Sequence, residues 1–167
     1  MVPLIEFRDV RVDGDDGAIV AGFSAAIPAG RLTVMVGPSG AGKTTLLRLL
    51  NRLDDPDAGA VLFAGRDVRA YDVLDLRRRV QVVGQVPVTF PGTVAANVGG
   101  DAAALLGRVG LSPALAVRSA SKAGIEELIV GLARSGLTVV MVTHDPRHTD
   151  LADHVVTVER LAREDGS

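Results

Sequence analysis

Hydrophobic and polar side chains alternate over residues 4–12, which read Leu-Ile-Glu-Phe-Arg-Asp-Val-Arg-Val. A cluster of turn-forming residues, Asp-Gly-Asp-Asp-Gly at 13–17, separates this segment from a second apolar run at 18–27. Alternation with a period of two is typical of a strand with one buried face, and Asp and Gly favour tight turns. The pattern therefore predicts two antiparallel strands joined by a short turn.

Two further segments, 31–36 and 137–142, are almost continuously apolar. Short runs of this kind are typical of strands that are buried on both faces of a sheet. Leucines recur at helical spacing over residues 43–53 and predict a helix there. The other predicted elements are strands at 60–64, 80–84 and 154–159, a loop at 87–92, and helices at 72–79, 93–98, 101–109 and 120–135. Helices that alternate with buried strands predict an α/β fold, with the first two strands and 60–64 on an antiparallel side.

A glycine-rich loop stands between the apolar run at 31–36 and the helix that follows. Its sequence, Gly-Pro-Ser-Gly-Ala-Gly-Lys-Thr at 37–44, matches the phosphate-binding pattern G-x-x-x-x-G-K-[ST] in the strand-to-helix context that this pattern requires. In such a loop backbone N–H groups surround the phosphates of a nucleotide, Lys43 reaches the β- and γ-phosphates, and Thr44 can ligate Mg²⁺. A glycine-rich turn with a purely structural role would need neither the lysine nor the hydroxyl.

The loop therefore predicts ATP and Mg²⁺ as ligands, with Thr44 as a metal ligand. The predicted nucleotide-binding residues are Gly37, Pro38, Ser39, Gly40, Ala41, Gly42, Lys43, Thr44 and Thr45.

Composition narrows the class of protein. With 167 residues, 47% of them hydrophobic and 23% charged, the chain has the composition of one soluble folded domain. Its net charge of −2 lacks the basic excess through which proteins hold phosphate backbones, so nucleic acid is not an expected partner. There is no cysteine, which excludes disulfides, thiolate catalysis and cysteine-ligated metals. The longest apolar runs are far shorter than the ~20 residues of a membrane span, and the N-terminus has no secretory pattern, so we expect a cytoplasmic protein.

Several segments around the loop resemble the nucleotide-binding domain of ABC transporters. The hairpin that precedes the loop is similar to that of the family, whereas a nucleotide kinase usually begins with its loop. Residues 82–98, with Gln85 and with Phe-Pro-Gly-Thr-Val at 90–94, resemble the Q-loop of the family, and Val-Thr-His-Asp at 142–145 resembles its switch-histidine segment. The resemblance implies an α/β P-loop NTPase fold of the ABC ATPase type, with an antiparallel β side and a shortened helical subdomain.

The resemblance also implies roles for two further polar residues. Gln85 would bind Mg²⁺ or the attacking water through its amide oxygen, and His144 would donate a hydrogen bond to the γ-phosphate. A surface glutamine and a histidine at the end of a strand, without these roles, are the alternative interpretations. The other histidines, His148 and His154, match no element of the family pattern, and lone surface histidines are more common than ligands.

Two family segments are missing from the sequence. The signature resembling Leu-Ser-Gly-Gly-Gln does not occur, and Leu111-Ser112-Pro113 is the nearest string. The Walker B strand, with its Mg²⁺-ligating Asp and the adjacent water-polarising Glu, is also absent, and Glu126-Glu127 and Asp145 are poor substitutes. The main loss falls near residues 118–119, with a smaller one near 98–99. Val12 and Asp13 occupy the place where the family has an aromatic residue that stacks on adenine.

The missing strand has a consequence for the sheet. In the family the strand equivalent to 137–142 lies beside 31–36, and the Walker B strand separates it from 80–84. We therefore predict that 80–84 pairs directly with 138–142, which would bring Gln85 and His144 closer together. Otherwise an open strand edge would make the chain marginally stable and prone to aggregation.

The resemblance implies an ATP-binding subunit that drives solute transport by a separate transmembrane permease. It also implies a homodimer, or a heterodimer with another nucleotide-binding subunit, held at the inner face of the cell membrane through the permease. We expect one domain over residues 1–167, with a remnant of the helical subdomain at about 93–118 and with impaired hydrolysis. The alternatives are a non-hydrolysing nucleotide-binding or regulatory module and, less favoured by the late loop, a small P-loop kinase.

Overall fold

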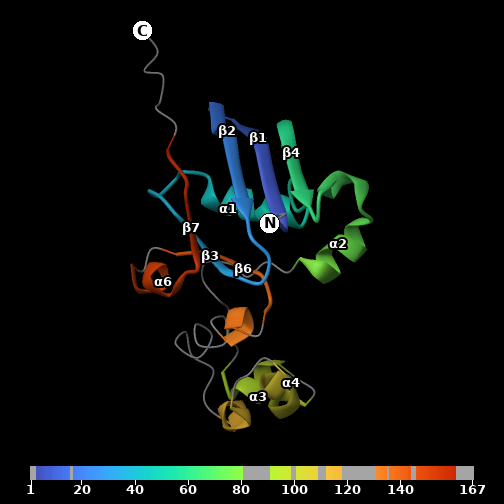
Figure 1. Cartoon of the computed structure of the whole chain (residues 1–167), viewed down its shortest axis with the longest axis vertical. Coiled ribbons are helices and arrows are strands. Elements are labelled where there is room, and N and C mark those ends of the chain that lie inside the picture. The colour runs from blue at the N-terminus through green and yellow to red at the C-terminus, as the bar shows by residue number, and fades with distance from the viewer. Residues whose placement is uncertain are drawn as a thin grey trace.

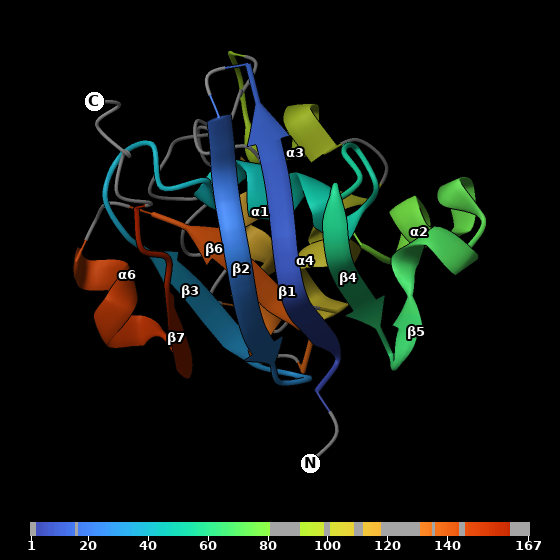
Figure 2. The same ribbon diagram turned by 90° about the horizontal axis from the view of Figure 1, so that it is seen from above.

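A computed structural model describes most of the chain as two sheets and several short helices. The described residues are 3–15, 17–80, 91–98, 101–108, 112–117, 131–134, 136–143 and 146–160. Figure 1 shows helix α1 (Lys43–Leu50) between the two sheets. In Figure 2 the strands β2, β1 and β4 lie side by side in front of this helix.

The first sheet is antiparallel, with the strand order β2-β1-β4-β5. Its strands are β1 (Ile5–Gly14), β2 (Gly17–Ile27), β4 (Ala58–Phe63) and the short β5 (Arg66–Asp67). In β1 the side chains of Ile5 and Phe7 face the core and, after a shift in the pairing register, so do those of Val10 and Val12, so the predicted alternation holds on each side of this shift. The predicted antiparallel side is therefore confirmed, although β5 was not predicted.

The second sheet is parallel and places strand β3 (Leu32–Val36) at its centre, between β6 (Val139–Val142) and β7 (His154–Thr157). Met35 packs into the main core against α1, whereas Leu32 and Val34 pack on the opposite face with Ala133. This burial on both faces explains the continuous apolar run of β3. The pairing of β3 with β6 confirms the expectation that 137–142 lies beside 31–36. The predicted pairing of 80–84 with 138–142 lies outside the described residues, because 81–90 are not described.

Two predictions about helices need correction. Helix α1 ends at Leu50 and not at Leu53, because Arg52 adopts a left-handed backbone with a φ of 53° that a helix does not continue through. Helix α6 (Pro146–Leu151), which connects β6 to β7, was not predicted. The parallel strands β6 and β7, on either side of β3, need such a crossover, and a helix this short is too brief for a periodic pattern to reveal. Of the predicted helix at 120–135, residues 131–134 are described, and they are helical.

The remaining helices follow the chain from β5 onward. The 3-10 helix η1 (Val68–Ala70) and α2 (Val73–Arg79) come directly after β5, and the Asp72 carboxylate caps α2 by accepting bonds from two backbone N–H groups. Helices α3 (Val94–Val98) and α4 (Ala102–Arg108) and the 3-10 helix η2 (Pro113–Val117) lie together at one end of Figure 1. Their contacts form a separate small core of Ala102, Leu106 and Ala116.

Each of these three helices begins at a short polar side chain. Thr93 Oγ1 accepts a hydrogen bond from the Ala96 N–H, and Asp101 and Ser112 accept similar bonds in α4 and η2. Ser112 and Pro113, the described residues of the string nearest to the family signature, thus stand at the start of a 3-10 helix. In the described part of the chain, no helix has the length and apolar character needed to span a membrane.

Candidate functional site

The glycine-rich loop begins where β3 ends, and its first residue packs against the end of β7. The Val158 N–H donates a hydrogen bond of 2.8 Å to the Val36 carbonyl, which brings the two backbones together. Gly37 follows with a φ of 150°, and a Cβ at this position would collide with the Val158 carbonyl oxygen. Only glycine allows this approach, so the first glycine of the motif fixes the direction in which the loop leaves the sheet.

The last glycine of the motif, Gly42, connects the loop to α1. It is the N-cap of the helix and adopts a left-handed backbone with a φ of 84°. A Cβ on Gly42 would lie 2.5 Å from Val20 Cγ2, so this glycine also permits the close approach of strand β2. Among the described residues, no side chain caps the start of α1, and its first turn holds no acidic residue. The first N–H groups of the helix thus remain available to an anion, with the positive end of the helix dipole behind them.

Lys43 places its charge inside the curve of the loop. Its side chain is only 4% exposed, and Nζ donates hydrogen bonds to the carbonyl oxygens of Gly37 at 2.8 Å and of Pro38 at 2.6 Å. Burial of a lysine ammonium is tolerated only where hydrogen bonds compensate for the loss of water, and the two carbonyls supply them here. The loop and the lysine therefore hold each other in place.

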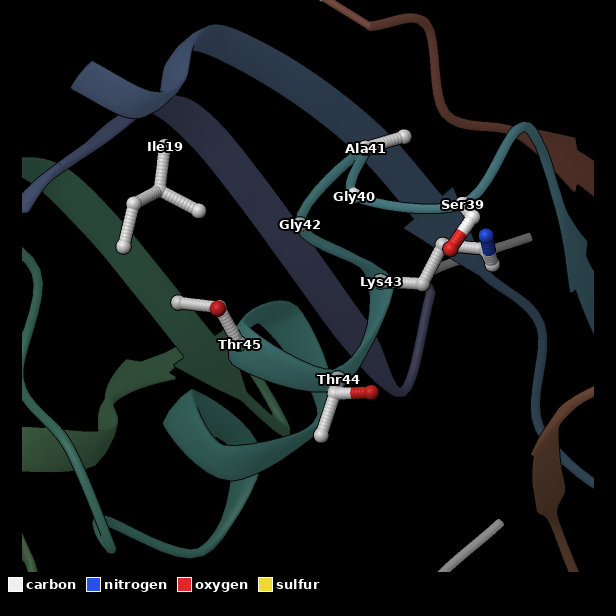
Figure 3. Close-up of a pocket in the computed structure, with 8 residues that line it drawn as sticks. All are labelled: Ile19, Ser39, Gly40, Ala41, Gly42, Lys43, Thr44 and Thr45. Atoms are coloured by element: carbon white, nitrogen blue, oxygen red, sulfur yellow. The ribbon is translucent and has the colours of Figure 1, made fainter. Parts of the chain in front are cut away.

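A pocket of about 290 Å³ opens at this point. Figure 3 shows its lining, which consists of the loop and helix start from Ser39 to Thr45 and of Ile19 from strand β2. Thr44 is exposed and Thr45 is half-buried. Backbone N–H groups, one ammonium and three hydroxyls make the lining rich in donors, which is the chemistry that phosphate oxygens require.

The donor set also fits a nucleotide that arrives with its own magnesium. Mg²⁺ prefers oxygen ligands and is usually bound through one or two protein groups together with substrate phosphates. The Thr44 hydroxyl is such an oxygen. Among the described residues, no group of three or more His, Asp or Glu side chains is arranged to hold a metal ion.

Of the nine predicted loop residues, the seven from Ser39 to Thr45 line the pocket, whereas Gly37 and Pro38 do not line it and instead accept the hydrogen bonds of Lys43. Gln85 and His144, and the carboxylates of Glu126, Glu127 and Asp145, lie outside the described residues.

At the predicted place of the base-stacking residue, Val12 is buried in the core. Asp13 is exposed beside it and is paired with Arg11. Ile19 was not predicted, because an aliphatic residue in a strand carries no sequence signal for a pocket.

One prediction about histidines is wrong. His148 is not a surface residue, since it is 5% exposed. Its Nδ1 lies 2.8 Å from Thr143 Oγ1, and the hydrogen bond joins helix α6 to the end of β6. The imidazole therefore fixes the residue next to His144 in the chain.

Comparisons with known proteins agree with this geometry. Residues 20–152 match the ABC transporter family. The chain is 46% identical over 97 residues to ABC transporter I family member 17 of Arabidopsis thaliana. The matched segment makes up 58% of this chain and 37% of that protein. The chain is 40% identical over 140 residues to the protein STAR1 of Oryza sativa, covering 77% of this chain and 39% of that protein.

A third relative, the ATP-dependent lipid A-core flippase of Methylococcus capsulatus, is 46% identical over 121 residues, which make up 71% of this chain and 19% of the flippase. The chain thus spans less than two fifths of the length of these relatives.

A solved structure shows the same fold. It is cbiO1 from Clostridium perfringens, described as part of the ABC transporter complex cbiONQ. The TM-score is 0.64 at 18% sequence identity, and the similarity covers 97% of this chain and 80% of cbiO1. The family match over most of the chain, the phosphate-binding loop and the α/β fold with an antiparallel side lead to one conclusion: the chain belongs to the ABC transporter family, as an ATP-binding domain of the P-loop NTPase fold.

Proposed function

We propose that this chain binds Mg-ATP in the pocket of the loop and acts as the ATP-binding component of an ABC transporter. The observation that carries the proposal is the position of the Lys43 ammonium, held by two carbonyls of the loop at the uncapped start of α1. Positive charge and backbone donors meet there on one side of a pocket. This arrangement favours a polyphosphate over a neutral ligand.

Each part of the loop has a role in this proposal. The backbone of residues 38–43 would surround the β-phosphate, Lys43 would contact the β- and γ-phosphates, and the Thr44 hydroxyl would hold Mg²⁺. The metal would neutralise charge between the β- and γ-phosphates. Gln85 and His144, carried over from the family pattern, would contact the metal or water and the γ-phosphate.

Hydrolysis by the isolated chain is slow in this proposal. An Asp-Glu pair does not occur anywhere in the sequence, so the metal-binding carboxylate and the water-polarising carboxylate of the family pattern are both missing. Positioned acid or base groups contribute ~10² to 10⁴ in rate. We expect turnover to fall by at least that factor relative to an ABC ATPase that has both.

The missing segments also affect the assembly that we propose for this domain. We propose that residues 1–167 form one nucleotide-binding domain, with α3, α4 and η2 as a reduced helical subdomain. A transmembrane permease would hold it at the inner face of the cell membrane. A homodimer would contain no Leu-Ser-Gly-Gly-Gln segment, whereas a heterodimer with another nucleotide-binding subunit would contain one. The second candidate function, a non-hydrolysing regulatory module, is favoured by the same two absences.

Calorimetry with Mg-ATP tests nucleotide binding. The wild type should bind, and Lys43→Ala should abolish the heat, whereas Lys122→Ala, at the other lysine of the chain, should leave it unchanged. Circular dichroism of each variant checks that the fold is retained. Equal heats for the wild type and Lys43→Ala would overturn the proposal.

Phosphate release separates the two candidate functions. Hydrolysis that rises when the chain is combined with its permease and a second nucleotide-binding subunit supports a transport ATPase. Binding without such stimulation supports the regulatory module.

A further inference from the structure

The pocket at the loop has two chemically different sides. The loop and the first turn of α1 supply the polar side, with the Ser39 hydroxyl, the Lys43 ammonium and the hydroxyls of Thr44 and Thr45. Ile19, on strand β2, is the lining residue that comes from another element within the described part of the chain, and Figure 3 shows its side chain across from the loop. A polyphosphate on the polar side would therefore carry its nucleoside toward an aliphatic surface.

Ile19 is both exposed and fixed. It is 38% exposed, although it is one of the large apolar residues of the sheet. A Cβ on Gly14 would come within 3.0 Å of Ile19 Cδ1, and one on Gly42 would lie 3.4 Å from Ile19 Cγ2. The isoleucine thus rests between two glycines, with one side of it open to the pocket.

The aromatic side chains of the described residues are engaged elsewhere. Phe7 and Phe23 form an edge-to-face pair at 5.2 Å, and Phe63 and Tyr71 form another at 5.8 Å. None of these four lines the pocket. The remaining aromatic residue of the sequence, Phe90, lies outside the described residues.

Given the proposed nucleotide binding, on which this step rests, we infer that Ile19 is the contact for the base and that the chain accepts nucleoside triphosphates without selecting among bases. An aliphatic surface offers neither a donor nor an acceptor to the edge of a base, and it provides no ring on which a base can stack. Affinity then comes from the polyphosphate and its metal, and the base adds only a weak apolar contact. The ligand class is a nucleoside triphosphate of any base.

The experiment compares the affinities of Mg-ATP, Mg-GTP, Mg-CTP and magnesium tripolyphosphate for the full chain by calorimetry. We expect the three nucleotides to bind within about three-fold of one another, because an apolar contact discriminates poorly among polar groups. Tripolyphosphate should bind within about ten-fold of them, because the apolar contact of the base is small. Ile19→Tyr should raise the affinity for Mg-ATP by about ten-fold, within the range that one base–aromatic stack supplies. It should leave tripolyphosphate unchanged.

A matched control is available on another strand. Val155 of β7 is an aliphatic strand residue that is 40% exposed and does not line the pocket. Val155→Tyr should change none of the four affinities, so a gain specific to Ile19→Tyr reports contact with the base. Thermal unfolding of both variants verifies that each is folded.

Three results would overturn the inference, and they differ from failure of the proposed function. Wild-type binding of Mg-ATP at least ten-fold tighter than Mg-GTP and Mg-CTP would show a base-selective site. Loss of that selectivity in Phe90→Leu would assign the base contact to Phe90. An Ile19→Tyr variant that is folded and unchanged in affinity would remove Ile19 from the site. In each of these cases Lys43→Ala still abolishes binding, whereas failure of the proposed function means that none of the four ligands binds in a Lys43-dependent way.

Discussion

Replacement of Gly37 by alanine tests how the loop is held against the sheet. The new Cβ would collide with the carbonyl oxygen of Val158 and would lie 3.1 Å from its carbonyl carbon. Both atoms belong to backbone that is hydrogen-bonded to Val36, so neither can rotate away as a side chain could. The φ of 150° is also one that an alanine rarely adopts.

The two effects add up to a large part of the stability of the domain. Overpacking of this kind costs ~1 to 3 kcal/mol, and a residue held in a sparsely populated backbone region costs ~1 to 3 kcal/mol more. We expect Gly37→Ala to lower the free energy of unfolding by about 2 to 6 kcal/mol, out of ~5 to 15 kcal/mol for a typical domain.

Gly40 provides the matched control within the same loop. Its φ is 77°, and a Cβ there would meet no atom within 4 Å, so Gly40→Ala carries the backbone strain without the collision. That strain alone costs ~1 to 2 kcal/mol. With a urea dependence of about 2 kcal/mol per molar, the unfolding midpoint should fall by roughly 1 to 3 M for Gly37→Ala and by roughly 0.5 to 1 M for Gly40→Ala. Circular dichroism measures the two unfolding midpoints. Equal midpoints for the two variants would refute the reasoning.

Three further predictions concern the sheets and their connections. Gly59→Ala should destabilise the chain by ~1 to 3 kcal/mol more than Gly65→Ala in urea unfolding. The two glycines have nearly equal φ values of 79° and 76°, but of the two only Gly59 would place a Cβ against the backbone of β1. A hydrogen bond from the Arg69 side chain holds the pKa of Asp67 below its ordinary value, so this pair stabilises the fold above pH ~4 and loses its effect as the pH falls further. The pair is partly exposed, and the pH dependence that Asp67→Asn removes should amount to no more than ~1 kcal/mol. His148→Leu should lower the unfolding temperature by ~1 to 6 °C, because it removes a buried hydrogen bond, and an unchanged value in calorimetry would contradict this.

The strands and the loop could be predicted because their causes are local. Burial on both faces leaves a continuous apolar run, as in β3; β6 has such a run too, although Val142 alone of its four residues is buried. The phosphate-binding loop is likewise a property of neighbouring residues, since glycines at fixed offsets set its backbone and the lysine bonds to carbonyls five and six residues before it.

The end of α1 could not be predicted from the leucine spacing, because the left-handed backbone of Arg52 ends the helix and part of its support is distant in the sequence. The spacing of the leucines continues to Leu53, yet this residue is 46% exposed. Arg77, from helix α2, donates hydrogen bonds of 3.1 Å to the Asn51 carbonyl and of 2.6 Å to the Arg52 carbonyl. These bonds give partners to two carbonyls directly after the end of the helix, where the helix itself supplies none. The leucine spacing does not contain this contact, which joins residues 25 and 26 positions apart.

The two sides of the pocket also differ in whether the sequence predicts them. The polar side could be predicted from one motif, whereas the apolar side exists because β2 approaches the start of α1. Gly42 permits that approach, since any larger residue would meet Val20. A glycine that the motif explains by phosphate binding therefore has a second role in packing, and this role brings Ile19 to the pocket. A larger residue at position 42 should for this reason disturb both the anion site and the surface that we assign to the base.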